Sequence, residues 1–298
     1  MSEGELYFES WGSTTAPALL YLHGGPGQGS YEFVQHQAAL LSARLRVVAL
    51  DQRGVLRSAP LAEGGSLSIA DLVADCETVR RQLGVDRWAV LGQSFGGMLA
   101  LRYATSHPES VTGLLFENPC WDVAATCRSI LSAVISHPAA APHPDARAWA
   151  ASALATNADA ESLWAALLKV LGALGADRDK IYVPDDEVRR RIDDVRAAAG
   201  FTAAEWGKGG RHLAQLIQDP DFFAPHTPLL SQWQRPALLI KGGLDPIPSA
   251  EEITAFRNAV PGAEIRVFEG NGHFVQAERP HEYADLVMDF VLGCREPR

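Results

Sequence analysis

The chain has 298 residues, 47% of them hydrophobic, so it is long enough for one large domain with a sizeable core. Its 26 basic and 36 acidic residues give a net charge of −10 with no basic run, which argues against nucleic acid or an anionic membrane as a partner. No stretch approaches the roughly 18 apolar residues of a membrane span, and the first ten residues, MSEGELYFES, lack the basic and apolar regions of a signal peptide. We therefore expect a soluble, cytoplasmic protein.

From the N-terminus, short apolar runs alternate with longer helical patterns. Helices are predicted at 31–43, 68–84 and 95–107. The runs that are typical of buried strands, each ending in a polar, Gly-rich loop, are 17–25, 45–54, 87–94, 111–119, 236–245 and 263–273. This alternation predicts βαβ units and a parallel sheet. In such sheets the chemistry collects at the carboxyl ends of the strands, where the polar loops lie.

The middle of the chain breaks this rhythm. From about Cys120 to Trp233 no strand is evident, and Ala-rich helical stretches are separated by breaks that contain proline, such as HPAAAPHP and YVPDD. Strands resume at Pro236. We therefore expect a helical insertion at 120–233 in an α/β core formed by 1–119 and 234–298.

The stretch WAVLGQSFGGML, from Trp88 to Leu99, joins a predicted strand to a predicted helix through Gly92-Gln93-Ser94-Phe95-Gly96. A turn this tight strains the backbone at Ser94 and needs small neighbours, which is the mechanical reason for the G-x-S-x-G nucleophile elbow. Alone, the pattern also fits a Gly-rich turn with a solvated serine.

An elbow serine needs a base, because its hydroxyl is a weak nucleophile, and a carboxylate that orients the base. Asp245 closes PALLIKGGLDPIPS, and His273 follows the last predicted strand in GNGHFVQAERP. The order Ser94, Asp245, His273 is the order of an α/β-hydrolase triad along the chain. We therefore predict these three residues as nucleophile, orienting acid and base.

The motif HGGPG, His23 to Gly27, follows the first predicted parallel strand. Backbone N–H groups aimed at a developing alkoxide lower the barrier of acyl transfer, and glycines let the backbone approach closely. We expect the Gly25 and Phe95 N–H groups to form this oxyanion hole. His23 is expected to brace the loop rather than to act as a base.

Together HGGPG, DQRG, GQSFGG, GGLDPIP and GNGH resemble the proline iminopeptidase branch of the α/β-hydrolases, over about 1–118 and 234–298. The resemblance implies a mostly parallel twisted sheet flanked by helices, with the inserted helices as a cap over the active site. It implies a serine hydrolase that releases an N-terminal residue, often proline, from a peptide or amide. Neither a cofactor nor a metal is expected, and the four cysteines form no CxxC pair or zinc-like cluster.

Three departures from the family pattern indicate a specialised relative. The loop reads DQRGVLRS, with Leu56 where the family has a second glycine, and since leucine resists a positive φ we expect the loop to be built differently. The elbow carries Gln93 and Phe95 where peptidase members carry Gly and Trp. Only one strand, ELYFESW, fits before residue 17. The branch includes amide hydrolases that remove an aminoacyl group from a natural product such as a macrolactam.

An aminopeptidase must bind a free ammonium, which in a partly dry pocket requires carboxylates. The resemblance implies acidic residues from the cap, and the candidates are Glu205 and Glu117, with Trp121 beside Glu117 as an apolar wall. Alternatively, Glu205 is a solvated helix residue, Glu117 braces a loop, and Trp121 only packs in the core.

We thus expect hydrolysis of an amide through an acyl-enzyme, with release of an aminoacyl group from a short peptide or small molecule that has a free amino terminus. An esterase, thioesterase or lactonase with the same triad is the alternative, and a non-catalytic binding module is a third. The protein is expected to be a monomer or a homodimer.

Overall fold

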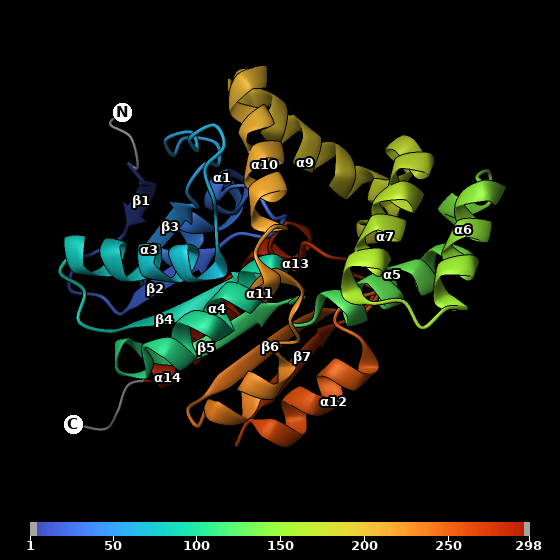
Figure 1. Ribbon diagram of the computed structural model, residues 1–298. Coiled ribbons are helices and arrows are strands. Elements are labelled where there is room, and N and C mark those ends of the chain that lie inside the picture. The colour runs from blue at the N-terminus through green and yellow to red at the C-terminus, as the bar shows by residue number, and fades with distance from the viewer. Residues whose placement is uncertain (1–4, 295–298) are drawn as a thin grey trace.

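The computed structural model of the chain describes residues 5–294, which form one seven-stranded sheet of order β1-β3-β2-β4-β5-β6-β7. Helices cover both faces of the sheet (Figure 1). All neighbouring strands run parallel except β1, which pairs antiparallel with β3 at one edge and is the single strand predicted before residue 17. The strands are β1 Tyr7–Trp11, β2 Ala18–Leu22, β3 Arg46–Asp51, β4 Trp88–Gln93, β5 Val111–Glu117, β6 Ala237–Gly242 and β7 Glu264–Phe268.

The central strands are mostly hydrophobic because both of their faces are buried. Along β2, Leu20 and Leu22 pack in one hydrophobic cluster, and Leu19 and Tyr21 pack in another on the opposite face. This two-sided burial follows from the period of two in a strand.

The helices of the core begin and end largely where the sequence predicts. Ser68 caps α3 by accepting a hydrogen bond from Asp71 N, and Asp71 caps Ser68 N in return. The predicted helix at 31–43 contains a π-helical turn in its centre, η1. Among the described residues, no helix is long and apolar enough to cross a membrane. These helices are α1 Tyr31–Phe33, η1 Val34–Ala38, α2 Ala39–Leu41, α3 Ile69–Gln82, α4 Phe95–Ser106, η2 Pro108–Ser110, α12 Ala250–Ala259, α13 Val275–Glu278 and α14 Pro280–Gly293.

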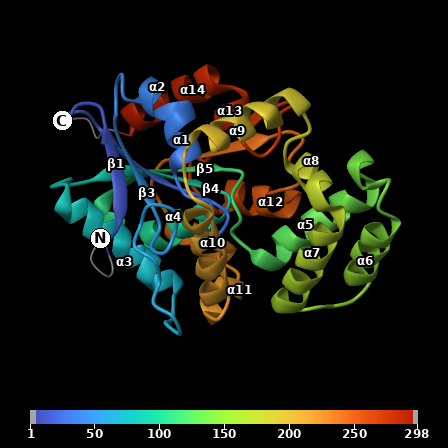
Figure 2. The ribbon, with the colours of Figure 1, turned by 90° about the horizontal axis from the view of Figure 1, so that it is seen from above.

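The described segment between β5 and β6 consists of helices joined by loops and contains no strand. Helices α5, α6 and α7 pack on one another beside the core. Helices α9 and α10 lie apart from them, with α9 against α1 and α13 and with α10 hydrogen-bonded to the loop after β3 (Figure 1, Figure 2). The division of the chain into a core and a cap domain at 120–233 stays a prediction. The inserted elements are α5 Val123–Ser136, η3 Pro138–Ala140, α6 Pro144–Leu154, α7 Ala160–Leu174, η4 Gly175–Arg178, α8 Asp179–Tyr182, α9 Asp186–Ala198, α10 Ala203–Leu216, α11 Pro220–Phe223 and η5 Thr227–Gln232.

Leu56 contradicts the expectation that the loop after β3 avoids a left-handed backbone at this position. Its φ is 36°, a region that costs a non-glycine residue roughly 1–2 kcal/mol. The side chain is buried against Gly29, where an added Cβ would lie 2.3 Å from Leu56 Cδ1. Full burial of a leucine contributes about 1.5–3 kcal/mol, which offsets the backbone strain.

Candidate active site

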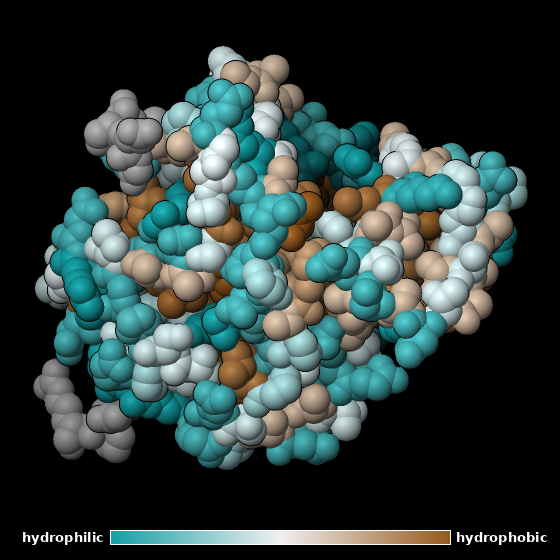
Figure 3. Space-filling model, viewed as in Figure 1, coloured by the Kyte–Doolittle hydropathy of each residue, from teal (hydrophilic) through white to brown (hydrophobic). Residues whose placement is uncertain are grey.

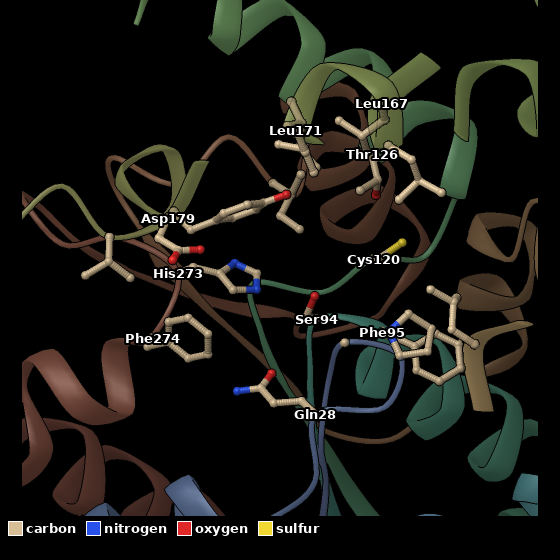
Figure 4. A pocket seen from close by; sticks show the side chains of 18 of the residues that line it. Gln28, Ser94, Phe95, Cys120, Thr126, Leu167, Leu171, Asp179, His273 and Phe274 are labelled. Carbon is tan, nitrogen blue, oxygen red and sulfur yellow. The ribbon is translucent and has the colours of Figure 1, made fainter. Parts of the chain in front are cut away.

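Ser94 stands in the turn between β4 and α4 with φ 53° and ψ −121°, a conformation rare for a residue with a side chain. Its glycine neighbours are required by close contacts. A Cβ on Gly92 would lie 2.2 Å from Gly96 O, and a Cβ on Gly96 would lie 2.0 Å from Leu22 O. The sequence therefore forms the strained turn that was predicted, and the Ser94 hydroxyl faces a cavity (Figure 4).

Asp245 and His273 lie in the loops that follow β6 and β7, and the fold brings them together. His273 Nδ1 is 2.6 Å from Asp245 Oδ2, and both residues are buried. Because a carboxylate accepts, Nδ1 carries the proton and Nε2 is left free to act as a base. Figure 4 shows the imidazole and the Ser94 hydroxyl facing one another, and both residues line the cavity.

Asn118, the residue after β5, links the two loops that carry Asp245 and His273. Its Oδ1 accepts from Gly242 N at 2.9 Å, and its Nδ2 donates to His273 O at 3.0 Å and to Gly272 O at 3.3 Å. The residue is fully buried and has a φ of 42°, which asparagine tolerates better than most residues. Sequence reasoning missed it, although an asparagine at the carboxyl end of a strand was the available signal.

The HGGPG loop lies beside Ser94. His23 Nδ1 donates to Gly24 O at 2.9 Å, and its Nε2 accepts from Gln52 N at 3.1 Å, so the imidazole braces the loop. Burial lowers the pKa of His23, which keeps the ring neutral for this acceptor role. Gly25 and Phe95 both line the cavity, and within residues 5–294 neither of their N–H groups donates a hydrogen bond.

The cavity has a volume of about 340 Å³. In Figure 3, hydrophobic side chains are visible between α10 and α7. Within the described part of the chain, the aspartate and arginine side chains of the lining all belong to α8 and α9, namely Asp179, Arg189, Asp193 and Arg196. The apolar lining comes mainly from α5, α7 and α11 and includes Val123, Ile130, Trp164, Leu167, Leu171 and Phe222.

Glu117 does not reach this cavity. It is fully buried, its Oε1 accepts from Gln276 N, and its Oε2 lies within hydrogen-bond distance of Tyr283 Oη, each at 3.0 Å. Burial raises the pKa of its carboxyl to about 8. Glu117 therefore links the end of β5 to Gln276 of α13, three residues beyond His273, and to α14. This is the bracing role given above as the alternative to binding an ammonium.

Glu205 and Trp121 also lie outside the cavity lining. Glu205 accepts hydrogen bonds from the backbone N and the hydroxyl of Thr202, which makes it the second half of a capping box at the start of α10. Trp121 is fully buried between Phe116 and Phe256. The spacing Thr202-x-x-Glu205 is the sequence signal that indicates the capping role.

The charged lining residues are engaged with one another and with the core. Arg196 donates from Nε to Glu32 Oε1 at 2.6 Å, and Gln28 donates to the same carboxylate at 3.3 Å. Arg196 also lies 3.6 Å from Asp193, and Arg189 pairs with Asp186. The charged residues of α9 thus include side chains that reach the cavity.

The described part of the chain holds no group of three or more His, Cys, Asp or Glu placed to bind a metal ion. Its four cysteines are free. Cys120 lines the cavity, and burial raises the pKa of its thiol, which keeps the sulfur protonated and poorly nucleophilic.

A serine raised on a strand–turn–helix elbow above a mostly parallel sheet, with a histidine and an aspartate at the ends of later strands, defines an α/β hydrolase. Residues 17–280 match the family model described as "alpha/beta hydrolase fold", and the chain belongs to this family.

One part of the chain is similar to curated proline iminopeptidases. The proline iminopeptidase of Neisseria meningitidis serogroup A is 40% identical over 111 residues, which are 37% of this chain and 35% of that protein. The match thus spans about a third of the length of this curated relative.

Two solved structures resemble nearly the whole chain. The proline iminopeptidase-related protein of Thermus thermophilus has a TM-score of 0.75 and 26% identity, covering 98% of this chain and 95% of that one. The enol-lactonase of Burkholderia xenovorans has a TM-score of 0.67 and 19% identity, covering 96% of each chain, and shares the fold alone.

Proposed function

We propose that this chain is a serine hydrolase that releases an aminoacyl group from a peptide or small-molecule amide through an acyl-enzyme. The observation that carries the proposal is the 2.6 Å contact between His273 and Asp245, with the free side of the imidazole facing the strained Ser94 at the cavity floor. The similarity to proline iminopeptidases supports an amide whose acyl part bears a free amine.

The reaction follows from these positions. Ser94 Oγ attacks the carbonyl carbon while His273 Nε2 takes its proton, and the oxyanion accepts hydrogen bonds from Gly25 N and Phe95 N. The tetrahedral intermediate collapses, the C–N bond breaks, and the amine leaves with the proton held by His273. Water then loses a proton to His273 Nε2 and attacks the acyl-enzyme. The bond between the acyl carbon and Ser94 Oγ breaks, His273 returns the proton to Oγ, and the acid is released.

The acidic residues that line the cavity, Asp179 and Asp193, are the proposed partners of the substrate ammonium. Figure 4 shows Asp179 on the same side of the cavity as His273. These residues take the role that the sequence pattern assigned to Glu117 and Glu205, which lie outside the lining. The apolar walls of α5 and α7 favour a substrate with a large hydrophobic part.

An esterase, thioesterase or lactonase is the second candidate. The favouring observation is that Arg196 of the lining lies 3.6 Å from Asp193, so that the charge of this acid is already partly neutralised. A site of this composition also accepts an uncharged acyl group held by apolar contacts alone.

One substrate panel separates the two functions. Aminoacyl nitroanilides with a free amine, the same compounds with the amine acetylated, and acyl esters of equal size are compared at one pH. The proposal expects the free-amine amides to be cleaved at least ten-fold faster than the acetylated ones. Equal rates, or esters that outrun every amide, refute aminoacyl release and support the second candidate.

Ser94→Ala tests the shared mechanism. It is expected to lower kcat by about 10⁴-fold or more on every substrate, because the nucleophile is removed. Ser136→Ala, at an exposed position on α5, is the matched control and is expected to leave kcat unchanged. Turnover retained by Ser94→Ala refutes the serine mechanism.

A further inference from the structure

Helix α10 contains three glycines within four residues, Gly207, Gly209 and Gly210, although glycine weakens the interior of a helix. Two of them have no steric reason to be glycine. A Cβ on Gly207 or on Gly210 would meet nothing within 4 Å.

Gly209 differs, because it lies directly against the backbone of the HGGPG loop. A Cβ on Gly209 would lie 2.4 Å from Gly27 O, and a Cβ on Gly27 would lie 2.8 Å from Gly209 Cα. Ordinary contacts of this kind begin near 3.4 Å, so an alanine at 209 forces a relative movement of about 1 Å. The neighbour is backbone rather than a flexible side chain and cannot rotate away.

The helix itself is fixed to the core, so it resists moving away from the loop. Lys208 Nζ donates to Leu56 O at 2.7 Å and to Ser58 O at 3.0 Å. One turn later, His212 Nδ1 donates to Arg53 O at 2.9 Å. These contacts hold α10 on both sides of Gly209 to the segment that follows β3.

We infer that Gly209 is a positioning residue, through which the inserted helix α10 sets the place of the oxyanion loop. The inference rests on the proposed function, in which Gly25 N stabilises the oxyanion. Gly25 is two residues from Gly27, and Gln28 N closes the intervening turn onto Gly24 O at 3.3 Å. A displacement of the Gly27 backbone is therefore expected to move the Gly25 amide as well.

The consequence for catalysis is specific to the transition state. Oxyanion donors act only within about 2.7–3.1 Å of the charged oxygen, and loss of one donor lowers kcat by about 10²–10³-fold. Most of the apolar lining lies on α5, α7 and α11, which Gly209 does not touch, whereas the loop contributes Gly25, Pro26 and Gln28 and α10 contributes Leu213. A shift of this loop is therefore expected to lower kcat while KM stays nearly constant.

The experiment compares Gly209→Ala with Gly207→Ala and Gly210→Ala, which insert the same methyl group into the same helix. For each purified variant kcat, KM, the melting temperature and the affinity for an alkyl boronic acid, which forms a tetrahedral adduct on serine, are measured. Gly209→Ala is expected to lower kcat and boronate affinity by about 10–100-fold, with KM changed less than three-fold. The two control variants are expected to keep kcat and to raise the melting temperature.

A Gly209→Ala variant with the kcat and boronate affinity of Gly210→Ala overturns the inference, and so does a loss confined to KM. If Gly209→Ala does not fold, the Lys208→Met variant tests the inference instead. It removes the hydrogen bonds that hold α10 to the segment after β3 and adds no steric clash with the loop. A three- to ten-fold fall in its kcat at constant KM supports the inference, and an unchanged kcat overturns it. Retained turnover in Ser94→Ala is a separate result, because it refutes the proposed function rather than the role of Gly209.

Discussion

Replacing Glu117 by glutamine is expected to remove a pH-dependent part of the stability of this protein. Glu117 is fully buried at the end of β5, where burial is the main cause that raises the pKa of its carboxyl from 4.5 to about 8, and the charges of Glu278 and Asp245 raise it further. In the folded protein at neutral pH the group is therefore held mostly as the neutral acid. Glutamine reproduces that form, since its oxygen accepts from Gln276 N and its amide donates to Tyr283 Oη.

The sign and size of the effect follow from linkage. Between pH 4.5 and about 8 the folded chain holds a proton on Glu117 that the unfolded chain has lost. The contribution of Glu117 to the free energy of unfolding is therefore largest below pH 4.5 and falls as the pH rises to about 8. At about 1.36 kcal/mol for each pH unit, the interval corresponds to a loss of at most about 5 kcal/mol in the free energy of unfolding.

The assay is urea unfolding of the parent chain and of Glu117→Gln at pH 5 and at pH 9. The difference between the two proteins isolates Glu117, because the other titrating groups are common to both. Glu117→Gln is expected to be about as stable as the parent at pH 5 and more stable by a few kcal/mol at pH 9. The exposed Glu161→Gln serves as the control for loss of one charge. Equal losses of stability between pH 5 and pH 9 in the parent and in Glu117→Gln refute a buried, neutral Glu117.

Two further predictions concern the site. Asn118→Gly preserves the left-handed backbone but removes the three side-chain hydrogen bonds to the loops that carry Asp245 and His273, so kcat is expected to fall by about 10–100-fold. The exposed Asn157→Gly is its control. Equal activity of the two variants contradicts the role of Asn118. Asp179→Asn is expected to raise KM about two- to five-fold for free-amine amides and to leave acyl esters unaffected, because an ion pair at this exposed side chain contributes up to about 1 kcal/mol. Glu187→Gln, exposed on α9, is the matched charge control, and a loss of equal size on amides and esters shows that Asp179 does not bind the amine.

The strands, the elbow and the loops that bear Asp245 and His273 were predictable because each is encoded locally. An apolar run that ends in glycine and a polar residue predicts both a buried strand and the edge at which its loop emerges. The 2.6 Å contact between His273 and Asp245 then follows from the order of β6 and β7 in the sheet.

The residues that line the cavity opposite Ser94 were not predictable in the same way. β5 is buried on both faces, so the period of two could not say on which side of the sheet Glu117 would point. The direction of each inserted helix depends on packing between distant segments, as the Arg196–Glu32 pair shows. For Glu205 a local signal existed, because Thr202 three residues earlier marks a capping box.

The exit of the chain from β5 has a practical consequence for chimeric proteins. The short segment from Asn118 to Cys120 leads into the helices, yet Asn118 restrains both catalytic loops and Cys120 N donates to Ser94 O at 2.9 Å. An exchange of the whole segment between β5 and β6 with that of a relative would thus remove the contacts that hold Ser94 and the Asp245 and His273 loops, along with the helices that line the cavity. A graft spliced after Asp122, which caps α5, leaves this junction in its parental form and transfers only the walls of the cavity.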